Sequence, residues 1–314
     1  MTQLKTAVIG VGYLGKFHAQ KYAQHADAKL IAVCDSNIDI ANQIASEHCA
    51  SSTTDYQEII DQVDAVSIVV PTQKHFAVAK DFLSMGKHVL LEKPMTTTVE
   101  QAQELVDIAA TNKTKLQIGH LERFNPAIVA LNDVLQQPTF IESHRVAPFN
   151  PRGADVNVVL DLMIHDIDII LDIVDSNVKS IAANGVSALS TDVDIANARL
   201  EFENGCIANV TASRASLKSE RKMRIFQDDA YMSVDFQNKS LGIYRKGKDE
   251  MFPGIPNIDK EELAFEQGDA LASEIDAFIK AINNNTQVVV SGEAGLRALA
   301  TAELISKQLN HTAD

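Results

Sequence analysis

The feature that most constrains the fold is the regular alternation of short apolar runs with helical segments over residues 5–120. Apolar runs that predict strands occupy residues 5–11, 29–35, 65–71, 88–94 and 115–120. The segments between them, of about 10–15 residues, have the apolar spacing of helices. This alternation predicts βαβ units with parallel strands and right-handed crossovers. We therefore predict an α/β class protein whose residues 1–122 form a doubly wound parallel sheet of the Rossmann type.

The remainder of the chain, residues 123–314, has a different pattern. Strand-like runs dominate, and Asn204-Gly205 between two alternating runs predicts a β-hairpin. Helices are expected only at 156–174, 270–283 and 292–309. This pattern predicts a C-terminal α+β domain on an open, mostly antiparallel sheet. The last helix has the length to pack back on the Rossmann domain.

Composition narrows the class of protein. With 314 residues, 46% of them hydrophobic, the chain can bury two moderate cores. No apolar tract approaches the ~20 residues that span a bilayer, and the N-terminus lacks signal-peptide features. The three cysteines have no metal or redox spacing. A net charge of −14 argues against binding of nucleic acid or an anionic membrane surface. We expect a soluble, cytoplasmic protein whose ligand is a small molecule.

The turn after the first predicted strand reads Gly10-Val11-Gly12-Tyr13-Leu14-Gly15. The strand before it, the helix after it and Asp35, 20 residues beyond Gly15, match the dinucleotide-binding pattern. We predict that this turn, including Tyr13 and Leu14, binds the pyrophosphate of NAD and that Asp35 binds the ribose. A carboxylate there repels a 2′-phosphate, which favours NAD over NADP. The alternative is a bare glycine turn without a ligand.

Two later strand ends carry further candidates. Thr72 and His75, after the third strand, could line the cofactor crevice; the alternative is a helix start at which Thr72 caps the next helix. Lys93 follows the fourth strand between Glu92 and Pro94. Proline restricts the residue before it, so Lys93 is expected in an extended pose at the ligand-binding edge of the sheet. The alternative is an ordinary solvent-exposed strand end.

In the predicted helix at 156–174, nearly every residue from Val158 to Val174 is apolar outside one stripe of polar residues. Asp161, His165, Asp168 and Asp172 are spaced by four, three and four residues and share one face. Three interpretations remain open: acid/base chemistry in a cleft, a solvated face, and a metal site. We expect no metal, because no second His/Glu cluster supplies the missing ligands.

These motifs together resemble the Gfo/Idh/MocA family of NAD(P)-dependent oxidoreductases. The resemblance rests on the three glycines, Pro71-Thr72…His75, Glu92-Lys93-Pro94, "GHLERFNP" and Asp161…His165. It implies oxidation of a sugar or polyol hydroxyl by hydride transfer, with Lys93 and His165 on either side of the reacting carbon and Asp161 beside them. It also implies cofactor contacts at Pro71, Thr72, His75 and Glu92, and a lysine–proline bond that is often cis. Met163, where many members have glycine, is a departure that affects the substrate pocket.

Four polar residues suggest an anionic substrate, since planar guanidinium groups bind phosphate or carboxylate. They are Arg123, Asn125, Arg145 and Arg152. Their motifs resemble the family branch that oxidises UDP-N-acetylglucosamine at its 3-hydroxyl, on the route to an amide-linked lipid A. The alternative for these arginines is salt bridging within the protein. Two other functions also stay open: oxidation or reduction of another sugar, polyol or carbonyl compound, and a non-catalytic dinucleotide sensor.

The second domain also leads to a prediction of assembly. Its sheet has helices for one face only, and we expect the other face to be rich in Val, Ile, Ala and Phe. An uncovered apolar face of that kind favours association, so we predict a homodimer or homotetramer.

Overall fold

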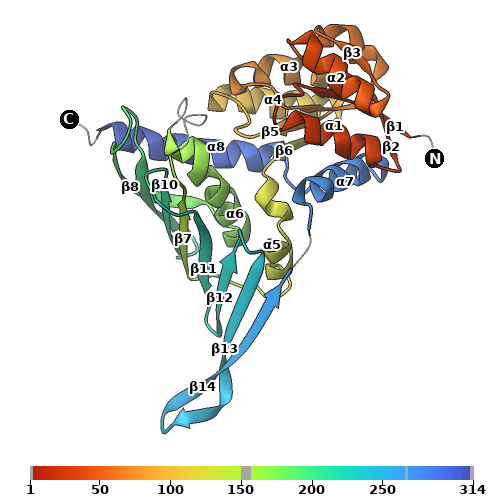
Figure 1. Cartoon of the computed structure of the whole chain (residues 1–314). Helices are drawn as coiled ribbons and strands as arrows, with labels where there is room; N and C mark the ends of the chain where they lie inside the picture. The colour runs from red at the N-terminus through yellow and green to blue at the C-terminus, as the bar shows by residue number, and fades with distance from the viewer. Residues whose placement is uncertain (1–2, 150–156, 266–267, 312–314) are drawn as a thin grey trace. The chain divides into compact units, whose positions relative to one another are not determined.

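A computed structural model of the chain describes residues 3–149, 157–265 and 268–311. The chain divides into two compact units, the first formed by Met1–Leu121 with Asp269–Leu299 and the second by Glu122–Gly268 with Ala300–Asp314. The long helix α8 (Gly292–His311) contributes its first residues to one unit and its remaining residues to the other (Figure 1). Among the described residues, none of the helices combines the length and hydropathy that a bilayer span requires.

The first unit contains a parallel sheet that, within the described ranges, has six strands in the order β3-β2-β1-β4-β5-β6. The strands are β1 (Leu4–Ile9), β2 (Ala28–Cys34), β3 (Ser51–Thr53), β4 (Ala65–Ile68), β5 (His88–Glu92) and β6 (Leu116–Gly119). The last four residues of β1 and all of β4 are buried, as expected for parallel strands covered on both faces. The predicted Rossmann sheet is confirmed; the short strand β3 was not predicted.

Helices cover this sheet and pack in two groups. The helices are α1 (Gly15–Gln24), α2 (Ile38–His48), η1 (Tyr56–Gln62), α3 (Thr72–Ser84), α4 (Val99–Asn112) and α7 (Ala270–Asn283). Helix α1 packs beside α2 and α7, whereas α3 packs beside α4. Sequence analysis placed α7 in the second domain. Its residues Leu271, Ile275 and Phe278 instead share a core cluster with Val8 and Ala19, because its apolar face completes the cover of the first sheet.

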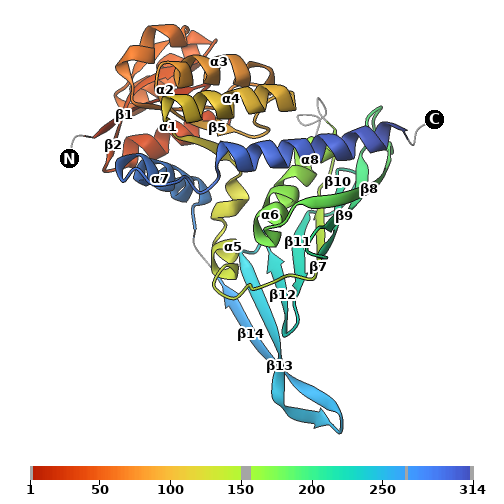
Figure 2. The same ribbon diagram turned by 180° about the vertical axis from the view of Figure 1, so that it is seen from behind.

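The second unit contains a sheet in which eight described strands follow the order β14-β13-β12-β11-β7-β10-β9-β8 (Figures 1 and 2). In chain order they are β7 (Phe140–Val146), β8 (Val178–Val186), β9 (Ile195–Phe202), β10 (Ile207–Ser213), β11 (Glu220–Phe226), β12 (Ala230–Asp235), β13 (Ser240–Phe252) and β14 (Ile255–Ala264). Among the described strand pairs of this sheet, only β7 and β10 are parallel. Gly205, with φ of 88°, turns the chain between β9 and β10, which confirms the hairpin. The mostly antiparallel sheet is likewise confirmed.

The helical elements of the second unit pack near one face of this sheet. They are η2 (Leu121–Phe124), α5 (Pro126–Leu131), the π-helix η4 (Val159–Met163) and α6 (Ile164–Val174). Helix α6 contacts β7 and β10, and α5 contacts β12 and β13. These contacts bury the inward side chains of each strand, such as Ile141, Val210 and Ile225.

The opposite face of the sheet differs from the prediction of a surface rich in Val, Ile, Ala and Phe. Polar side chains dominate it, among them Glu142, Ser180, Asn184, Asn197, Arg199, Asn209, Thr211, Arg224 and Ser233, none of them buried. One row of aromatic rings crosses four strands on this face: Phe140, Phe226, Tyr231 and Tyr244, with neighbouring centroids 5.9, 4.9 and 5.1 Å apart. We name this row the aromatic row. The composition predicted for the open face is therefore wrong.

Candidate active site

The glycine turn between β1 and α1 has the backbone geometry that its three glycines predict. Gly10 has a φ of 87°, and a side chain there would meet Val69 O at 2.5 Å. A side chain at Gly15 would collide with Gly10 O. At Gly12, by contrast, no described atom beyond Gly12 and its two chain neighbours lies within 4 Å of the position a Cβ would take. Gly10 and Gly15 therefore allow the tight turn, and Gly12 leaves open space above it, as the approach of a pyrophosphate requires.

The helix that follows begins without a side-chain cap. Leu14 occupies the N-cap of α1 and has no side-chain acceptor for the first-turn N–H groups. Tyr13 is 75% exposed. An N-terminus of this kind presents backbone donors and the positive end of the helix dipole to an anion. The glycine turn and α1 thus fit a pyrophosphate group.

Asp35 lies at the carboxyl end of β2, next to the glycine turn. Its Oδ2 accepts a hydrogen bond from Val11 N–H, and its Oδ1 accepts one from Asn37 N–H, both at 2.9 Å. These two bonds fix the carboxylate without using all of its lone pairs. The remaining acceptor capacity suits the ribose hydroxyls of the dinucleotide.

The strand order places these groups on both sides of a topological switch point. The order reverses between β1 and β4, which is where open α/β sheets bind ligands at their carboxyl ends. Asp35 follows β2 on one side, and Lys93 follows β5 on the other. Because adjacent strands lie ~4.8 Å apart, β5 is roughly 10 Å from β1. We propose that a dinucleotide crosses the switch point from Asp35 toward Lys93.

Of the three residues predicted after β4, Pro71 and Thr72 lie at the start of α3, whereas His75 is buried within it. Pro71 is the N-cap of α3 and Thr72 is its first residue, so the alternative in which Thr72 caps the helix is wrong. His75 is buried, with Nε2 2.8 Å from Val70 O and Nδ1 2.9 Å from Pro94 O. Burial lowers the pKa of His75, and a neutral ring donates to only one of these carbonyl groups. We propose that His75 ties the end of β4 to Pro94, in place of direct cofactor contact.

Lys93 is the first residue after β5 and is partly buried. The Lys93–Pro94 peptide bond is cis, as the family resemblance led us to expect. The backbone N–H of Lys93 donates to Glu92 Oε2 at 3.3 Å. The Glu92 side chain therefore contacts the backbone of the candidate catalytic lysine.

The polar stripe of the second unit splits into two parts. Asp161 and His165 are partly buried and lie four residues apart, on η4 and at the start of α6. Ile164 N–H donates to Val159 O, which makes this segment a π-helix, a form that often marks functional sites. Asp168 and Asp172 instead form ion pairs with Arg123, so a solvated face is wrong for the buried Asp168. Asp161 and His165 remain the candidates for chemistry.

Arg145 was predicted to bind substrate, but it is 2% exposed and bound by carboxylates. Its Nη2 donates to Asp166 at 2.8 Å and its Nη1 donates to Glu122 at 2.9 Å. Burial alone lowers the pKa of Arg145, but the two carboxylates outweigh burial and raise it. Sequence reasoning missed Asp166 and Glu122; the signal available was Asp166 itself, an acid that lies off the polar stripe of an otherwise mostly apolar helix. We propose that Arg145 is structural.

Arg123 and Asn125 are engaged in a similar way. Arg123 Nε lies 3.0 Å from Asp168 Oδ2, and its other end pairs with Asp172. Asn125 caps α5 by accepting from Ala127 N–H, and its amide donates to Phe236 O at 3.0 Å. These contacts favour the alternative of internal bridging over contact with substrate. Arg152, the fourth predicted residue, lies outside the described residues.

Comparisons with known proteins agree with this geometry. A family model described as "Oxidoreductase family, NAD-binding Rossmann fold" matches residues 4–120, and the Gfo/Idh/MocA C-terminal domain matches residues 138–233. The chain is 42% identical over 303 residues to a UDP-N-acetylglucosamine 3-dehydrogenase of Acidithiobacillus ferrooxidans, covering 96% of each chain.

This chain belongs to the Gfo/Idh/MocA family. It is an NAD(P)-dependent dehydrogenase of CH–OH groups, and its first unit is an NAD-binding Rossmann fold.

One further relative and two solved structures also match along nearly the whole chain. The chain is 25% identical to an inositol 2-dehydrogenase of Rhizobium meliloti, covering 96% of this chain and 95% of the relative. Among solved structures, the A. ferrooxidans enzyme GnnA, a UDP-N-acetylglucosamine 3-dehydrogenase, matches with a TM-score of 0.92, 39% identity and full coverage of both chains. A scyllo-inositol dehydrogenase from Lactobacillus casei with bound NAD(H) matches at 0.81 and 22% identity over 99% of this chain and 98% of that one, which shows a shared fold.

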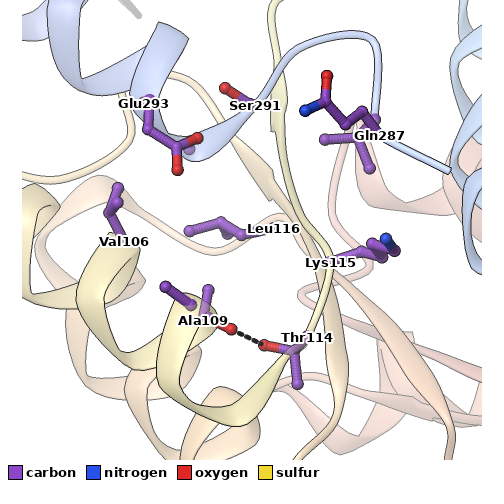
Figure 3. Close-up of a pocket in the computed structure, with 11 residues that line it drawn as sticks. Val106, Ala109, Thr114, Lys115, Leu116, Gln287, Ser291 and Glu293 are labelled. Atoms are coloured by element: carbon purple, nitrogen blue, oxygen red, sulfur yellow. Dashed lines mark hydrogen bonds between the residues drawn. The ribbon is translucent and has the colours of Figure 1, made fainter. Parts of the chain in front are cut away.

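One pocket of this Gfo/Idh/MocA chain lies away from the predicted cofactor crevice. Figure 3 shows it between α4, the segment entering β6 and the start of α8, with Val106, Lys115 and Glu293 in its wall. Thr114 donates to Ala109 O at 3.4 Å at its edge. Lys115 and Leu116 mark the amino end of β6, whereas dinucleotides bind at the carboxyl ends of the strands. This pocket is therefore not the cofactor crevice.

Proposed function

We propose that this dehydrogenase oxidises the 3-hydroxyl of UDP-N-acetylglucosamine, with NAD as the oxidant. The observation that carries the proposal is the 42% identity, over 96% of each chain, to a protein named UDP-N-acetylglucosamine 3-dehydrogenase. The inositol dehydrogenases that match along the same length share only about a quarter of their residues with this chain. A 3-keto sugar of this kind is a substrate for aminotransfer, which agrees with the route to an amide-linked lipid A.

The proposed roles follow from the chemistry of three side chains. NAD, when bound, supplies the acceptor for the hydride from the sugar carbon. The Lys93 ammonium group donates a hydrogen bond to the substrate oxygen and stabilises the charge that develops there. A ring nitrogen of His165 accepts the hydroxyl proton, because imidazole titrates near neutral pH. Asp161, four residues earlier, favours the imidazolium that results.

The preference for NAD over NADP rests on Asp35. Its carboxylate is fixed by the backbone of Val11 and Asn37 at the point where the ribose is expected. A 2′-phosphate at that point would face a negative charge, and Ser36 and Asn37 offer no compensating cation.

The test is a comparison of substrates with both nicotinamide cofactors. Reduction of NAD and of NADP is followed by absorbance with UDP-N-acetylglucosamine, UDP-glucose, myo-inositol and scyllo-inositol. We expect the highest kcat/KM for UDP-N-acetylglucosamine with NAD. A higher kcat/KM for an inositol would replace this proposal with the second candidate, an inositol dehydrogenase.

The oxidised carbon is identified by isotope. UDP-N-acetylglucosamine deuterated at C3 should show a primary kinetic isotope effect and transfer its deuterium to NADH, detected by mass spectrometry. Substrate deuterated at C4 is the matched control and should do neither. Transfer from C4 would contradict the proposed position of oxidation.

A further inference from the structure

Three ionisable side chains meet inside the first unit, and one of them belongs to Glu92, the residue before Lys93. His18 comes from α1, Glu92 ends β5, and Glu274 comes from α7. One nitrogen or oxygen atom of each lies within 4.8 Å of those of the other two. His18 Nε2 is 3.2 Å from Glu92 Oε1. We name these three residues the buried triad; none of the functions above uses His18 or Glu274.

The three side chains of the triad are ionisable, yet they are almost completely buried. His18 and Glu274 are fully buried, and the Glu92 side chain is 14% exposed. Among the described residues, neither carboxylate oxygen of Glu274 has a hydrogen-bond partner, although Gln117 Nε2 donates to its backbone oxygen at 3.2 Å. A buried ionised carboxylate without donors is costly, and a second carboxylate nearby adds repulsion.

We propose that Glu274 is a protonated carboxylic acid in the folded enzyme and that, with His18, it holds the Glu92 carboxylate in the position that supports Lys93. One proton shared between two neighbouring carboxyl groups relieves their repulsion and turns Glu274 into a donor. Burial, and to a smaller degree the charge of Glu92, raises the pKa of Glu274 well above its ordinary value, which agrees with this state. Glu274 is thus a positioning residue.

The groups around Glu274 favour a proton over a metal ion. They are His18 and Tyr22 from α1, Glu92 from β5, and the neutral Gln117 from β6. Tyr22 shares a hydrogen bond with Ser67 at 2.9 Å, and burial raises its pKa, so the phenol is neutral. Within the described chain the triad offers three ligand atoms, whereas a structural zinc site uses four.

The link to catalysis runs through the backbone of Lys93. Glu92 Oε2 accepts from Lys93 N–H at 3.3 Å while Glu92 Oε1 faces His18. The Glu92 side chain also packs on Gly119, where a Cβ would lie 2.9 Å from Glu92 Cδ. With Glu274 protonated, Glu92 is the one negative carboxylate of the triad. This catalytic consequence rests on the proposed function, whereas the protonation state does not.

The protonation state is tested without any activity assay. Infrared spectroscopy should show the carbonyl band of a protonated carboxyl group at neutral pH in the wild-type chain, and Glu274→Gln should lose that band. If the variant does not fold, isotope labelling of glutamate in the wild-type chain shifts the carbonyl bands of glutamic acids away from those of aspartic acids. Absence of a protonated glutamate band at neutral pH would overturn the proposal.

Thermal unfolding at several pH values gives a second, independent readout. The folded chain keeps the Glu274 proton after the unfolded chain has lost it, so wild-type stability falls as pH rises above the ordinary pKa of glutamate. The glutamine of Glu274→Gln has no proton to lose. Above the ordinary pKa of glutamate, the melting temperature of this variant relative to wild type should therefore rise by roughly 3 °C per pH unit. Glu47→Gln, at an exposed position of α2, is the control and should follow wild type at every pH. A flat difference for Glu274→Gln would count against a buried proton.

Turnover of UDP-N-acetylglucosamine tests the positioning role. Glu274→Ala should lower kcat by about ten- to a hundred-fold with NAD affinity retained, because a displaced lysine misaligns the reacting groups. Glu274→Gln, which keeps a donor of the same shape, should restore most of the loss. Equal losses in both variants would contradict positioning. A wild-type chain inactive on this substrate would refute the proposed function alone, and the infrared band would still decide the protonation state.

The same samples distinguish a metal site. Wild-type protein is treated with EDTA and then with zinc alone, and its melting temperature is measured. We expect neither EDTA nor zinc to change the melting temperature. A loss of stability on chelation that zinc reverses in wild type but not in Glu274→Gln would overturn it in favour of a cation.

Discussion

Asp35 Oδ2 accepts a hydrogen bond from the backbone N–H of Val11 at 2.9 Å, which joins the end of β2 to the middle of the glycine turn. The second oxygen accepts from Asn37 at the same distance. The carboxylate that we propose selects the cofactor is therefore bonded to the turn that we propose binds the pyrophosphate. Changes at Asp35 should alter the choice between NAD and NADP more than the fold of the Rossmann unit.

The first prediction concerns this choice of cofactor. The double variant Asp35→Ser/Ser36→Arg removes the negative charge and adds a partner for a 2′-phosphate. The affinity for NADP relative to NAD should rise by about ten- to a hundred-fold, equivalent to roughly 1.4–2.8 kcal/mol. Titration of both cofactors measures it. Ser36→Arg alone is the control and should shift the ratio less, because Asp35 still repels the phosphate. Tighter binding of NADP than NAD by wild type would mean that Asp35 does not face the ribose.

The second prediction concerns the catalytic side chains. Lys93→Ala and His165→Ala should each lower turnover by about two to four powers of ten, because each group acts on the substrate oxygen. Asp161→Asn should lower it less, since Asp161 acts through the imidazole. The affinity for NAD and the melting temperature should change little. His144→Ala, at an exposed histidine of β7, is the matched control. Near-wild-type rates in both alanine variants would refute this mechanism.

The third prediction separates structure from substrate binding at Arg145. Removing either partner of the buried Arg145–Asp166 pair leaves an uncompensated charge, so Arg145→Ala and Asp166→Ala should each cost about 3–5 kcal/mol of unfolding free energy. The double change Arg145→Met/Asp166→Leu should recover much of that loss. Chemical denaturation measures all three variants. An Arg145 variant with wild-type stability and a raised KM for UDP-N-acetylglucosamine would restore the role in substrate binding.

The fourth prediction concerns assembly. We still predict a homodimer or homotetramer, now through the aromatic row on the open face of the second sheet. A charge among stacked rings opposes their burial, so Tyr231→Asp should shift the molar mass toward the monomer. Light scattering at micromolar concentration measures it. Leu217→Asp, at a fully exposed loop residue, should leave the mass unchanged. A monodisperse wild-type monomer would refute the prediction.

Local patterns in the sequence were enough to predict the class of both sheets, although not the strands β3 and β14. The alternation over residues 5–120 predicted the Rossmann unit, and Asn204-Gly205 predicted the β9–β10 hairpin. These features depend on neighbours within a few residues, where periodicity and turn chemistry act directly. Strand β14 was missed because its residues are mostly exposed and four of its ten residues are charged, and only its pairing with β13 makes it a strand.

The glycine turn, Asp35 and Lys93 could be placed at strand ends from sequence, because these positions are set by the fold class itself; their roles stay predictions. The partners of Arg145 and Arg123 were not found from sequence. Arg145 and Asp166 are 21 residues apart in sequence. The sequence does not distinguish an arginine that is exposed to ligand from one that is buried against an acid. Only the packing of α6 on the second sheet determines that Arg145 is buried.

The buried triad is the clearest case of a feature that tertiary structure alone decided. His18 lies on α1, Glu92 on β5 and Glu274 on α7, three elements that are far apart in sequence. The residues next to Glu274 in sequence do not predict that its carboxyl group is buried. In sequence, Glu274 is an ordinary polar residue of an amphipathic helix. The apolar face of α7 packs on the Rossmann core and carries this carboxyl group out of water, next to a second one. Desolvation and charge repulsion depend on distance in space, and sequence reports distance only along the chain.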